Sequence, residues 1–293
     1  MANNIREYRR RIKSVKNTAQ LTRAMKMVSA AKLRRAQEKM MAARPYAAAL
    51  RRALAEVARR ADPSLHPLLA RRPERTIDLL VVTSDKGLCG AFNVNILKAA
   101  EAFRREKVAA GVDVQLTLIG RKGIEYFKVR PDVPIRARYP EISREIGHGL
   151  ARRFAAEEEA RFIGGETDAV YVAFNEFKSA ISQRVVVQPL FPLANLAVED
   201  AGEFRREGVD FLYEPEPQEL LDGLLSRFAS FQLYHALLES SAAEHAARMA
   251  AMDNATRNAE EMIDKLTLVM NRIRQASITT EIIEVVSGAQ ALD

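Results

Sequence analysis

The sequence has a single cysteine and no tryptophan, and such absences limit what the protein can be. One cysteine, Cys89, excludes a disulfide within the chain and fits a reducing compartment. No apolar run reaches the roughly 18 residues that a membrane-spanning helix needs. Aromatic residues make up only 6% of the chain, although its hydrophobic content of 48% is enough for a core. We therefore expect a protein of the cytosol with no helix that crosses a membrane.

Glycine and proline are missing from both ends of the chain. Residues 1–44 contain neither, and 64 consecutive residues without either follow Gly223. A helix of that length is roughly 95 Å long at 1.5 Å per residue, which no small domain can bury. All but two of the 13 glycines, by contrast, lie between Gly87 and Gly208. The distribution predicts long terminal helices on either side of a compact central domain.

The apolar residues of the C-terminal segment recur at alternating steps of three and four, which is typical of a coiled coil. The residues at these positions are Leu224, Phe228, Phe231, His235, Leu238, Ala242, His245, Met249, Met252, Thr256, Ala259, Ile263, Leu266, Met270 and Ile273. The alternative is one long helix of an ordinary bundle, but bundle helices rarely exceed about 25 residues without caps. Beyond Ile273 the apolar residues spread around the helix, and we expect this tip to need an apolar surrounding.

The N-terminal segment carries a similar seam at Ile5, Tyr8, Ile12, Val15, Ala19 and Thr22. The pattern then shifts to Leu21, Met25, Val28 and Lys32 before Leu33, Ala36 and Met40 resume it, which predicts a stutter. Pro45 predicts a kink or an end of the helix, with a further helical piece at Tyr46–Ala61. Because the two arms stand at opposite ends of the chain, we expect them to pair in opposite directions.

Positive charge is concentrated in the first arm. Residues 1–72 hold 19 Lys and Arg against 4 Asp and Glu, a net of +15, whereas the whole chain has a net charge of +7. Such an arm needs an acidic partner, either nucleic acid or an acidic protein loop. Its only aromatic residues are Tyr8 and Tyr46, which leaves little for base stacking and favours a protein partner. A nucleic-acid-binding coiled coil remains an alternative.

The middle of the chain alternates strand and helix patterns. Strands are predicted at Thr76–Thr83, Val112–Ile119, Asp168–Phe174 and Arg184–Phe191, the last at a sheet edge because of Pro189. Helices are predicted at Phe92–Ala109 and Glu141–Phe162, and a short strand at Asp210–Tyr213. The fold class is therefore α/β with a mostly parallel sheet, plus a long antiparallel coiled coil. We expect segments 1–61, 73–217 and 218–287 as N-terminal helix, central domain and C-terminal helix.

No catalytic constellation is evident in the sequence. The loop SDKGLCG at residues 84–90 follows a strand and precedes a helix, where α/β folds bind phosphates, but neither GxxxxGK[ST] nor GxGxxG occurs. We interpret the loop as a glycine-rich turn and Cys89 as a small buried residue; an α/β enzyme using this loop is the other alternative. The four histidines show no metal-binding spacing. The run Glu157-Glu158-Glu159 is interpreted as a solvated helix face.

Three stretches of the chain resemble the γ subunit family of the F-type ATP synthase. They are IKSVKNTAQLTRAMKMVSAAKLRRAQ at residues 12–37, TSDKGLCGAFN at 83–93, and residues 244–292 with NRIRQASITTEI and EVVSGAQAL. The resemblance spans nearly the whole chain. It implies an antiparallel coiled coil of the terminal helices above a Rossmann-like foot, and a non-catalytic central rotor that needs no cofactor.

The resemblance also implies contact residues and partners. Arg23, Met25 and Lys26, and further along the shaft Arg274 and Gln275, resemble positions that touch β subunits. The tip residues Ile278, Ile282, Ile283, Val285 and Val286 resemble a hydrophobic bearing, and Tyr213 and Glu214 resemble contacts of the foot. The implied partners are the α3β3 hexamer, the ε subunit and the c-ring, with no nucleic acid. The implied location is the cytoplasmic face of a bacterial plasma membrane, as a peripheral protein.

Overall fold

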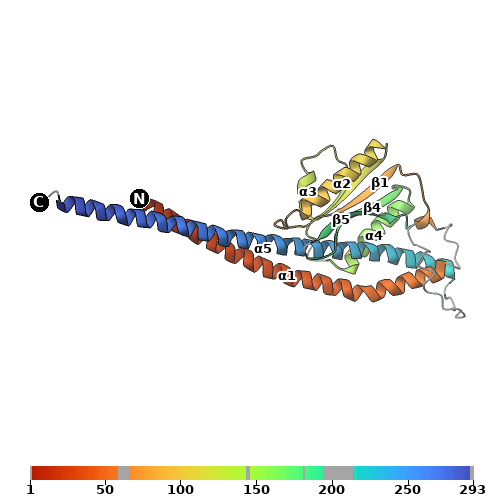
Figure 1. Cartoon of the computed structure of the whole chain (residues 1–293). Helices are drawn as coiled ribbons and strands as arrows, with labels where there is room; N and C mark the ends of the chain where they lie inside the picture. The colour runs from red at the N-terminus through yellow and green to blue at the C-terminus, as the bar shows by residue number, and fades with distance from the viewer. Residues whose placement is uncertain are drawn as a thin grey trace. The chain divides into compact units, whose positions relative to one another are not determined.

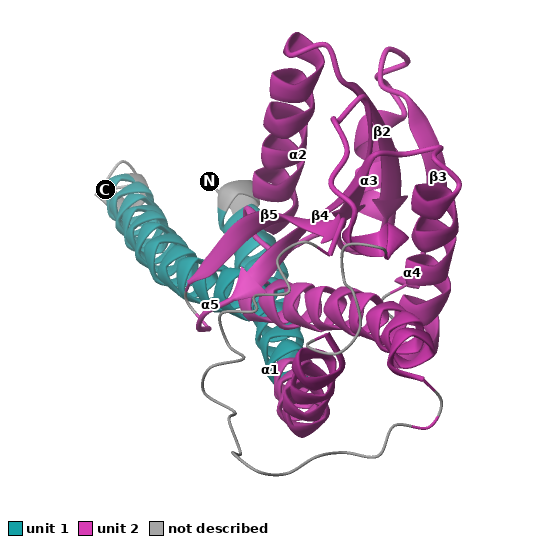
Figure 2. Ribbon diagram, turned by 90° about the vertical axis from the view of Figure 1, so that its right-hand side faces the viewer, with its two compact units in different colours: residues 1–30, 248–293 teal, residues 31–247 magenta. Residues whose placement is uncertain are grey.

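The computed structural model of the chain describes residues 2–58, 66–142, 146–180, 182–193, 214 and 216–290. The chain forms two compact units, which Figure 2 distinguishes by colour. Unit 1 combines residues 1–30 with residues 248–293, and unit 2 comprises residues 31–247. Two long helices, α1 (Ala2–Ala58) and α5 (Pro217–Gln290), contribute to both units (Figure 1).

Unit 1 consists of the first part of α1 paired with the last part of α5. The hydroxyl of Thr22 contacts that of Thr256 at 2.7 Å, and the Lys26 ammonium contacts the Asp253 carboxylate at 2.5 Å. Thr22 precedes Lys26 in α1, whereas their partners Thr256 and Asp253 follow in the reverse order in α5. The helices are therefore antiparallel, as Figure 1 shows. The predicted direction of pairing is therefore confirmed.

The seam of α1 has no stutter, and the prediction of one is wrong. Leu21 and Val28 are 62% and 56% exposed, and Lys32 is exposed as well. The buried stripe continues instead from Thr22, which the predicted seam includes, to Ser29, a polar residue that an apolar pattern overlooks. Each satisfies its hydroxyl locally, as when Ser29 Oγ donates to the carbonyl of Met25 at 2.8 Å. The three- and four-residue steps therefore continue without a shift.

Pro45 lies inside α1, which continues to Ala58 without ending. The missing N–H of Pro45 removes only one intrahelical hydrogen bond, usually a loss of about 3 kcal/mol or more within a helix. Packing offsets that loss, because Leu50, Leu54 and Val57 beyond the proline are buried in the core of unit 2. Tertiary contacts therefore override the local signal that predicted a separate helical piece.

Unit 2 is built around a five-stranded sheet with the order β3-β2-β1-β4-β5. The strands are β1 (Thr76–Val82), β2 (Asp113–Ile119), β3 (Ile135–Tyr139), β4 (Ala169–Phe177) and β5 (Gln183–Phe191). The first four are parallel, and β5 pairs antiparallel with β4 at the edge. The α/β fold class with a mostly parallel sheet is confirmed.

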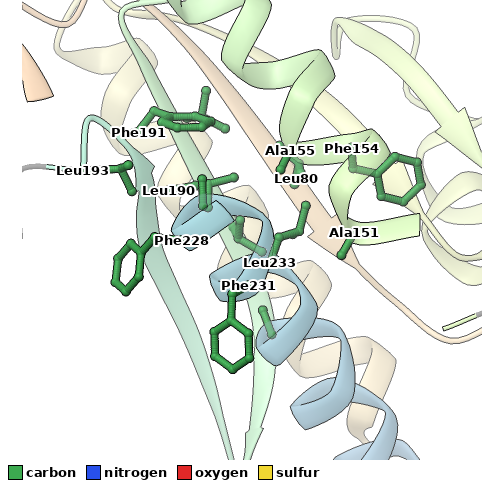
Figure 3. Close-up of a cluster of buried hydrophobic side chains, with 14 of the residues drawn as sticks. Leu80, Ala151, Phe154, Ala155, Leu190, Phe191, Leu193, Phe228, Phe231 and Leu233 are labelled. Carbon is green, nitrogen blue, oxygen red and sulfur yellow. The ribbon is translucent and has the colours of Figure 1, made fainter. Parts of the chain in front are cut away.

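Each face of the sheet has its own core. Residues of β1 alternate between them: Ile77, Leu79 and Val81 pack with α2 (Phe92–Ala109) and α3 (Arg121–Phe127). Leu80 and Val82 face the other side, with α4 (His148–Ile163) and parts of α1 and α5. Figure 3 shows side chains of this second core, among them Leu80 and Leu233. The continuous apolar run of β1 thus reflects burial on both faces.

Some elements differ from those predicted. β3 and α3 were not expected, since both are short and lack a strong apolar period. The helix predicted to start at Glu141 begins only at His148, because Glu141 has φ +63° and its backbone N–H donates to Asp85 Oδ1 at 2.8 Å. The strand predicted at Asp210–Tyr213 lies outside the described residues. α5 begins at Pro217, a favoured residue for the first turn of a helix.

Within unit 2, α5 is buried more widely than a coiled-coil seam. Besides Phe228, Leu238 and Ala242 on the expected stripe, Ala229 and Leu233 are completely buried against the sheet side. His235, placed on the stripe from the sequence, keeps 49% of its side chain exposed. The narrow seam is thus a property of unit 1 only.

No helix among the described residues is long and apolar enough to cross a membrane. The boundary between the two compact units falls inside α1, after residue 30, and inside α5, before residue 248, and so does not coincide with the predicted domain boundaries. The segments 1–61, 73–217 and 218–287 therefore remain a prediction as domains.

Candidate functional site

The predicted basic contact residues lie on the outer side of the helix pair in unit 1. Arg23 contacts Glu260 at 2.6 Å and Lys26 contacts Asp253 at 2.5 Å, yet their side chains stay 65% and 44% exposed. Hydrogen bonding from Lys26 lowers the pKa of Asp253. Met25 is half-buried between them. Two cations and a methionine are therefore brought together on one short stretch of α1.

These ion pairs were not foreseen from the sequence, because their acidic partners stand more than 200 positions away. Asp253 also contacts Arg257 at 3.1 Å, one turn further along α5. Exposed ion pairs contribute only about 0–1 kcal/mol each, so an incoming carboxylate can replace them at little cost. The surface therefore remains available to an acidic partner.

The remaining residues predicted for the shaft are exposed on α5. Arg274 and Gln275 lie one turn before the tip, and both side chains face solvent. The tip residues Ile278, Ile282, Ile283, Val285 and Val286 are 48%, 57%, 58%, 73% and 51% exposed. Among the residues of α5 whose burial is described, which end at Ser287, Ser277 is the last buried one, at 7%. A cluster of five exposed β-branched side chains forms an apolar end that a partner can cover.

Of the predicted foot residues, only one can be located. Glu214 is exposed. Tyr213 lies outside the described residues.

The loop after β1 sits where α/β folds bind ligands, but α5 fills the site. The strand order reverses between β1 and β4, and the crevice at their carboxyl ends is the usual ligand position. Here Cys89 and Phe92, which follow β1, pack with Phe177 at the end of β4 against Ala243 of α5. The crevice is occupied by protein. Cys89 is 2% exposed, which confirms its prediction as a small buried residue.

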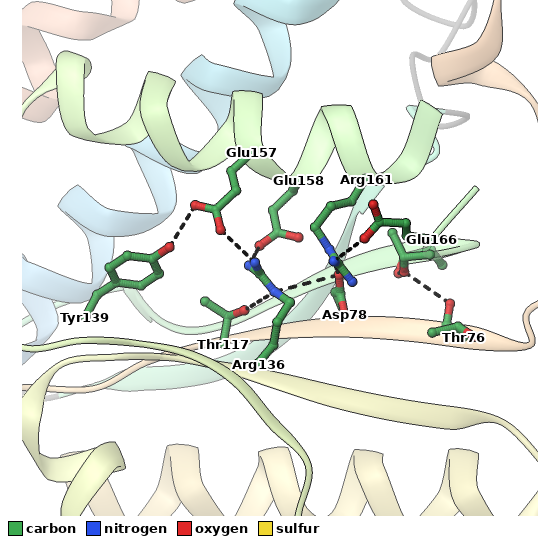
Figure 4. A network of polar contacts seen from close by, with 11 residues as sticks. Thr76, Asp78, Thr117, Arg136, Tyr139, Glu157, Glu158, Arg161 and Glu166 are labelled. Carbon is green, nitrogen blue, oxygen red and sulfur yellow. Dashed lines mark hydrogen bonds and ion pairs between the residues drawn. The ribbon is translucent and has the colours of Figure 1, made fainter. Parts of the chain in front are cut away.

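A network of charged residues lies between α4 and the sheet of unit 2 (Figure 4). Arg136 of β3 contacts Glu157 at 2.6 Å and also contacts Glu158, while Arg161 of α4 donates to Asp78 of β1 at 2.9 Å. Asp78 is fully buried and Glu158 is 1% exposed. The interpretation of residues 157–159 as a solvated face is therefore wrong. Three acidic residues in a row looked like surface, but their partners come from other elements: Arg136 and Tyr139 of β3 for Glu157 and Glu158, and Ser226 of α5 for Glu159.

Burial governs how these carboxyl groups titrate. It raises the pKa of Glu158 to about 8, with the charge of Asp78 adding to the shift and Arg136 opposing it. For Glu157, burial alone would raise the pKa, but hydrogen bonds from Arg136 and Tyr139 lower it below its ordinary value. Burial and the hydrogen bond to Glu157 raise the pKa of Tyr139 to about 12. The network is enclosed in the fold, so we assign it to stability. Among the described residues, no group of His, Cys, Asp or Glu could hold a metal ion.

Comparison with known proteins decides the family. A family model described as ATP synthase matches residues 4–292. The ATP synthase gamma chain of Anaeromyxobacter sp. (strain Fw109-5) is 49% identical over 98% of this chain and 99% of its own length. That of Solibacter usitatus is 50% identical, with 98% of each chain covered. The chain belongs to the ATP synthase gamma chain family. It is accordingly a non-catalytic subunit of that complex.

Solved structures agree with this assignment. The chain is 28% identical to one in the central stalk and c-ring of the Tetrahymena thermophila mitochondrial ATP synthase, with a TM-score of 0.60 and coverage of 80% of this chain and 99% of that one. A chain of the Euglena gracilis mitochondrial ATP synthase, in an assembly of OSCP, F1 and c-ring, has a TM-score of 0.68 at 18% identity. The match includes 100% of this chain and 95% of the Euglena chain. The second likeness concerns the fold alone. The first supports a place in a central stalk.

Proposed function

We propose that this subunit is the rotating shaft that couples ion-driven rotation of a c-ring to the three catalytic β sites, and that works in reverse during ATP hydrolysis. The observation that carries the proposal is the antiparallel helix pair of unit 1, with its exposed cations and apolar tip. Two paired helices resist twisting better than one, which a torque-bearing element requires. The partners would be the α3β3 hexamer, ε and the c-ring, at the cytoplasmic face of a bacterial inner membrane.

The contact residues have distinct roles in this proposal. Arg23 and Lys26, together with Met25, would meet an acidic loop of β and exchange their internal ion pairs for its carboxylates. Arg274 and Gln275 would touch β loops one turn before the apolar tip. The apolar tip would turn inside a hydrophobic collar, while Tyr213 and Glu214 would contact ε and the c-ring at the foot. These roles are the ones that the resemblance to the family implies; the exposed cations of α1 and the apolar tip of α5 support the first and the third of them.

Isolation of the assembled complex tests the proposal. A tagged full-length chain expressed in its host should co-purify with ATPase subunits, and a marker fixed to unit 2 should rotate when ATP is added. Replacing Arg23 and Lys26 by glutamate should lower the ATP-driven rotation rate, since like charges would then face an acidic loop. As a control, Arg34→Glu changes a cation that is 82% exposed and pairs with Glu38 on the same helix. An isolated chain that binds DNA in a salt-dependent manner, without ATPase subunits, would support the nucleic-acid-binding alternative instead.

A further inference from the structure

Four aromatic side chains enclose a hollow on the surface of unit 2. The ring centroid of Tyr46 on α1 lies 6.5 Å from that of His148 on α4. The ring centroid of His148 lies 5.9 Å from that of Tyr234 on α5. Phe231 of α5 closes this circle of four side chains. Its ring centroid lies 6.5 Å from that of Tyr234 and 5.6 Å from that of Tyr46. Each ring contacts the next, so three helices that are distant in sequence supply the walls of one site.

The hollow is apolar, open and small. Its volume is about 280 Å³, and besides the four aromatic residues it is lined by Ala42, Ala43 and Lys39. Tyr46 is 45% exposed although its ring stands at the edge of a core that buries Phe231 to 7%. Small-molecule pockets usually measure about 300–1,000 Å³ and bury most of their ligand. An open hollow at the lower end of that range has room for one large side chain of a protein partner.

The rim of the hollow is basic. Lys39 lines it, and Arg35 precedes Lys39 by one turn on the same side of α1. Arg152 follows His148 by one turn on α4. All three side chains are exposed and none forms an ion pair with another described residue, although Lys39 Nζ donates to the carbonyl of Ile146 at 3.4 Å. A partner carrying carboxylates beside an apolar side chain would match this distribution of charge.

We propose that this aromatic groove, defined by Tyr46, His148, Phe231 and Tyr234, docks an acidic amphipathic helix of another subunit of the complex. One apolar side chain of that helix would fill the hollow, and flanking carboxylates would face Lys39, Arg35 and Arg152. Aromatic pockets of this kind concentrate binding energy, while rim charges select the partner and speed its association. The site lies in unit 2 and uses none of the contacts proposed above for the shaft.

Photo-crosslinking in the intact ATP synthase complex tests this docking site. Tyr46 is replaced by p-benzoylphenylalanine, which keeps an aromatic ring at the groove, and cross-linked peptides are identified by mass spectrometry. We expect one helical segment of another subunit, with a net negative charge and an apolar residue at the attachment point. The same label at Val129, which is 76% exposed, provides the background for a random surface position.

Charge reversal then separates specific docking from proximity. Lys39→Glu should lower the yield of the cross-link about tenfold, because it places like charges together. Arg34→Glu, on a neighbouring side of the same helix, should leave the yield unchanged. Both residues are exposed, so neither variant threatens the fold. The proposal is overturned by the absence of a protein cross-link at Tyr46, by a neutral or basic target segment, or by a yield indifferent to Lys39→Glu. ATP hydrolysis measured in the same complexes shows whether the shaft itself still works.

Discussion

The two units of the chain use the same helices for different purposes. In unit 2, α5 is buried against both α1 and the sheet, and residues such as Leu225, Ala229 and Leu233 are completely inaccessible. In unit 1 the same helix buries a single narrow stripe and leaves Leu268, at 69%, and Ile282 exposed. Unit 2 is therefore held together as a domain, by its own core. In unit 1 only the stripe that joins the two helices is buried, and the rest of the surface is exposed and can contact partners.

The largest difference concerns completely buried charge: Asp78 and Glu158 of unit 2 are 0% and 1% exposed, whereas Arg248, the one buried charged residue described in unit 1, keeps 8%. Arg136→Met should destabilise unit 2 by about 1–3 kcal/mol, because the buried Glu158 would lose its hydrogen-bond partner, whereas Asp78 keeps Arg161. Urea unfolding followed by circular dichroism measures the loss. Arg138→Met, an exposed arginine of the same strand, is the matched control and should change little. Equal effects of the two variants would show that the network does not stabilise unit 2.

The pH dependence of unfolding should also distinguish unit 2. Because the pKa of Glu158 is raised to about 8 from 4.5, the folded state keeps a proton that the unfolded chain releases. The contribution of Glu158 is therefore complete below pH 4.5 and is lost as the pH rises toward 8. Glu158→Gln should remove this downward slope, as measured by thermal unfolding at a series of pH values. A slope that is the same in both proteins would mean that Glu158 titrates normally.

Much of this contrast could be predicted from the sequence, and the part that could not has a physical reason. Apolar period and the distribution of glycine and proline located β1, β2, β4, β5 and both long helices. The continuation of the seam from Thr22 to Ser29 was missed because a hydroxyl that bonds within its own helix can be buried without an apolar side chain. Glu158 was misjudged because its partner Arg136 comes from a strand too short to be recognised. Long-range partners decide the burial of polar residues, and no local pattern encodes them.

At the free end of unit 1, removing residues 282–293 should weaken assembly more than rotation. The truncation removes Ile282, Ile283, Val285 and Val286 among other residues, and each of these four side chains contributes about 1.5–3 kcal/mol if fully buried in a collar. The fraction of assembled complex should therefore fall at least about tenfold, as measured by native gel electrophoresis. Complexes that do assemble should still rotate, because the torque-bearing contacts lie lower. Loss of rotation in fully assembled truncated complexes would contradict this division of roles.

A smaller effect is expected within the seam of unit 1. Thr22→Val or Thr256→Val alone should cost about 1 kcal/mol, since each leaves one buried hydroxyl without its partner across the seam. The double variant should cost less than the two single changes added together, because it removes both hydroxyls. A double-mutant cycle from thermal unfolding gives the coupling energy. Strict additivity would mean that the 2.7 Å contact contributes nothing to pairing.

The most direct test of the account is whether the two helices of unit 1 turn as one body. Thr22→Cys combined with Thr256→Cys places two thiols where the hydroxyls are 2.7 Å apart, while the native Cys89 is buried in unit 2. We expect a disulfide to form on oxidation, and ATP-driven rotation of the assembled complex to stay within about twofold of the reduced rate, about 0.4 kcal/mol in activation free energy. Failure of the disulfide to form, or a rotation that stops on oxidation and returns on reduction, would contradict the account.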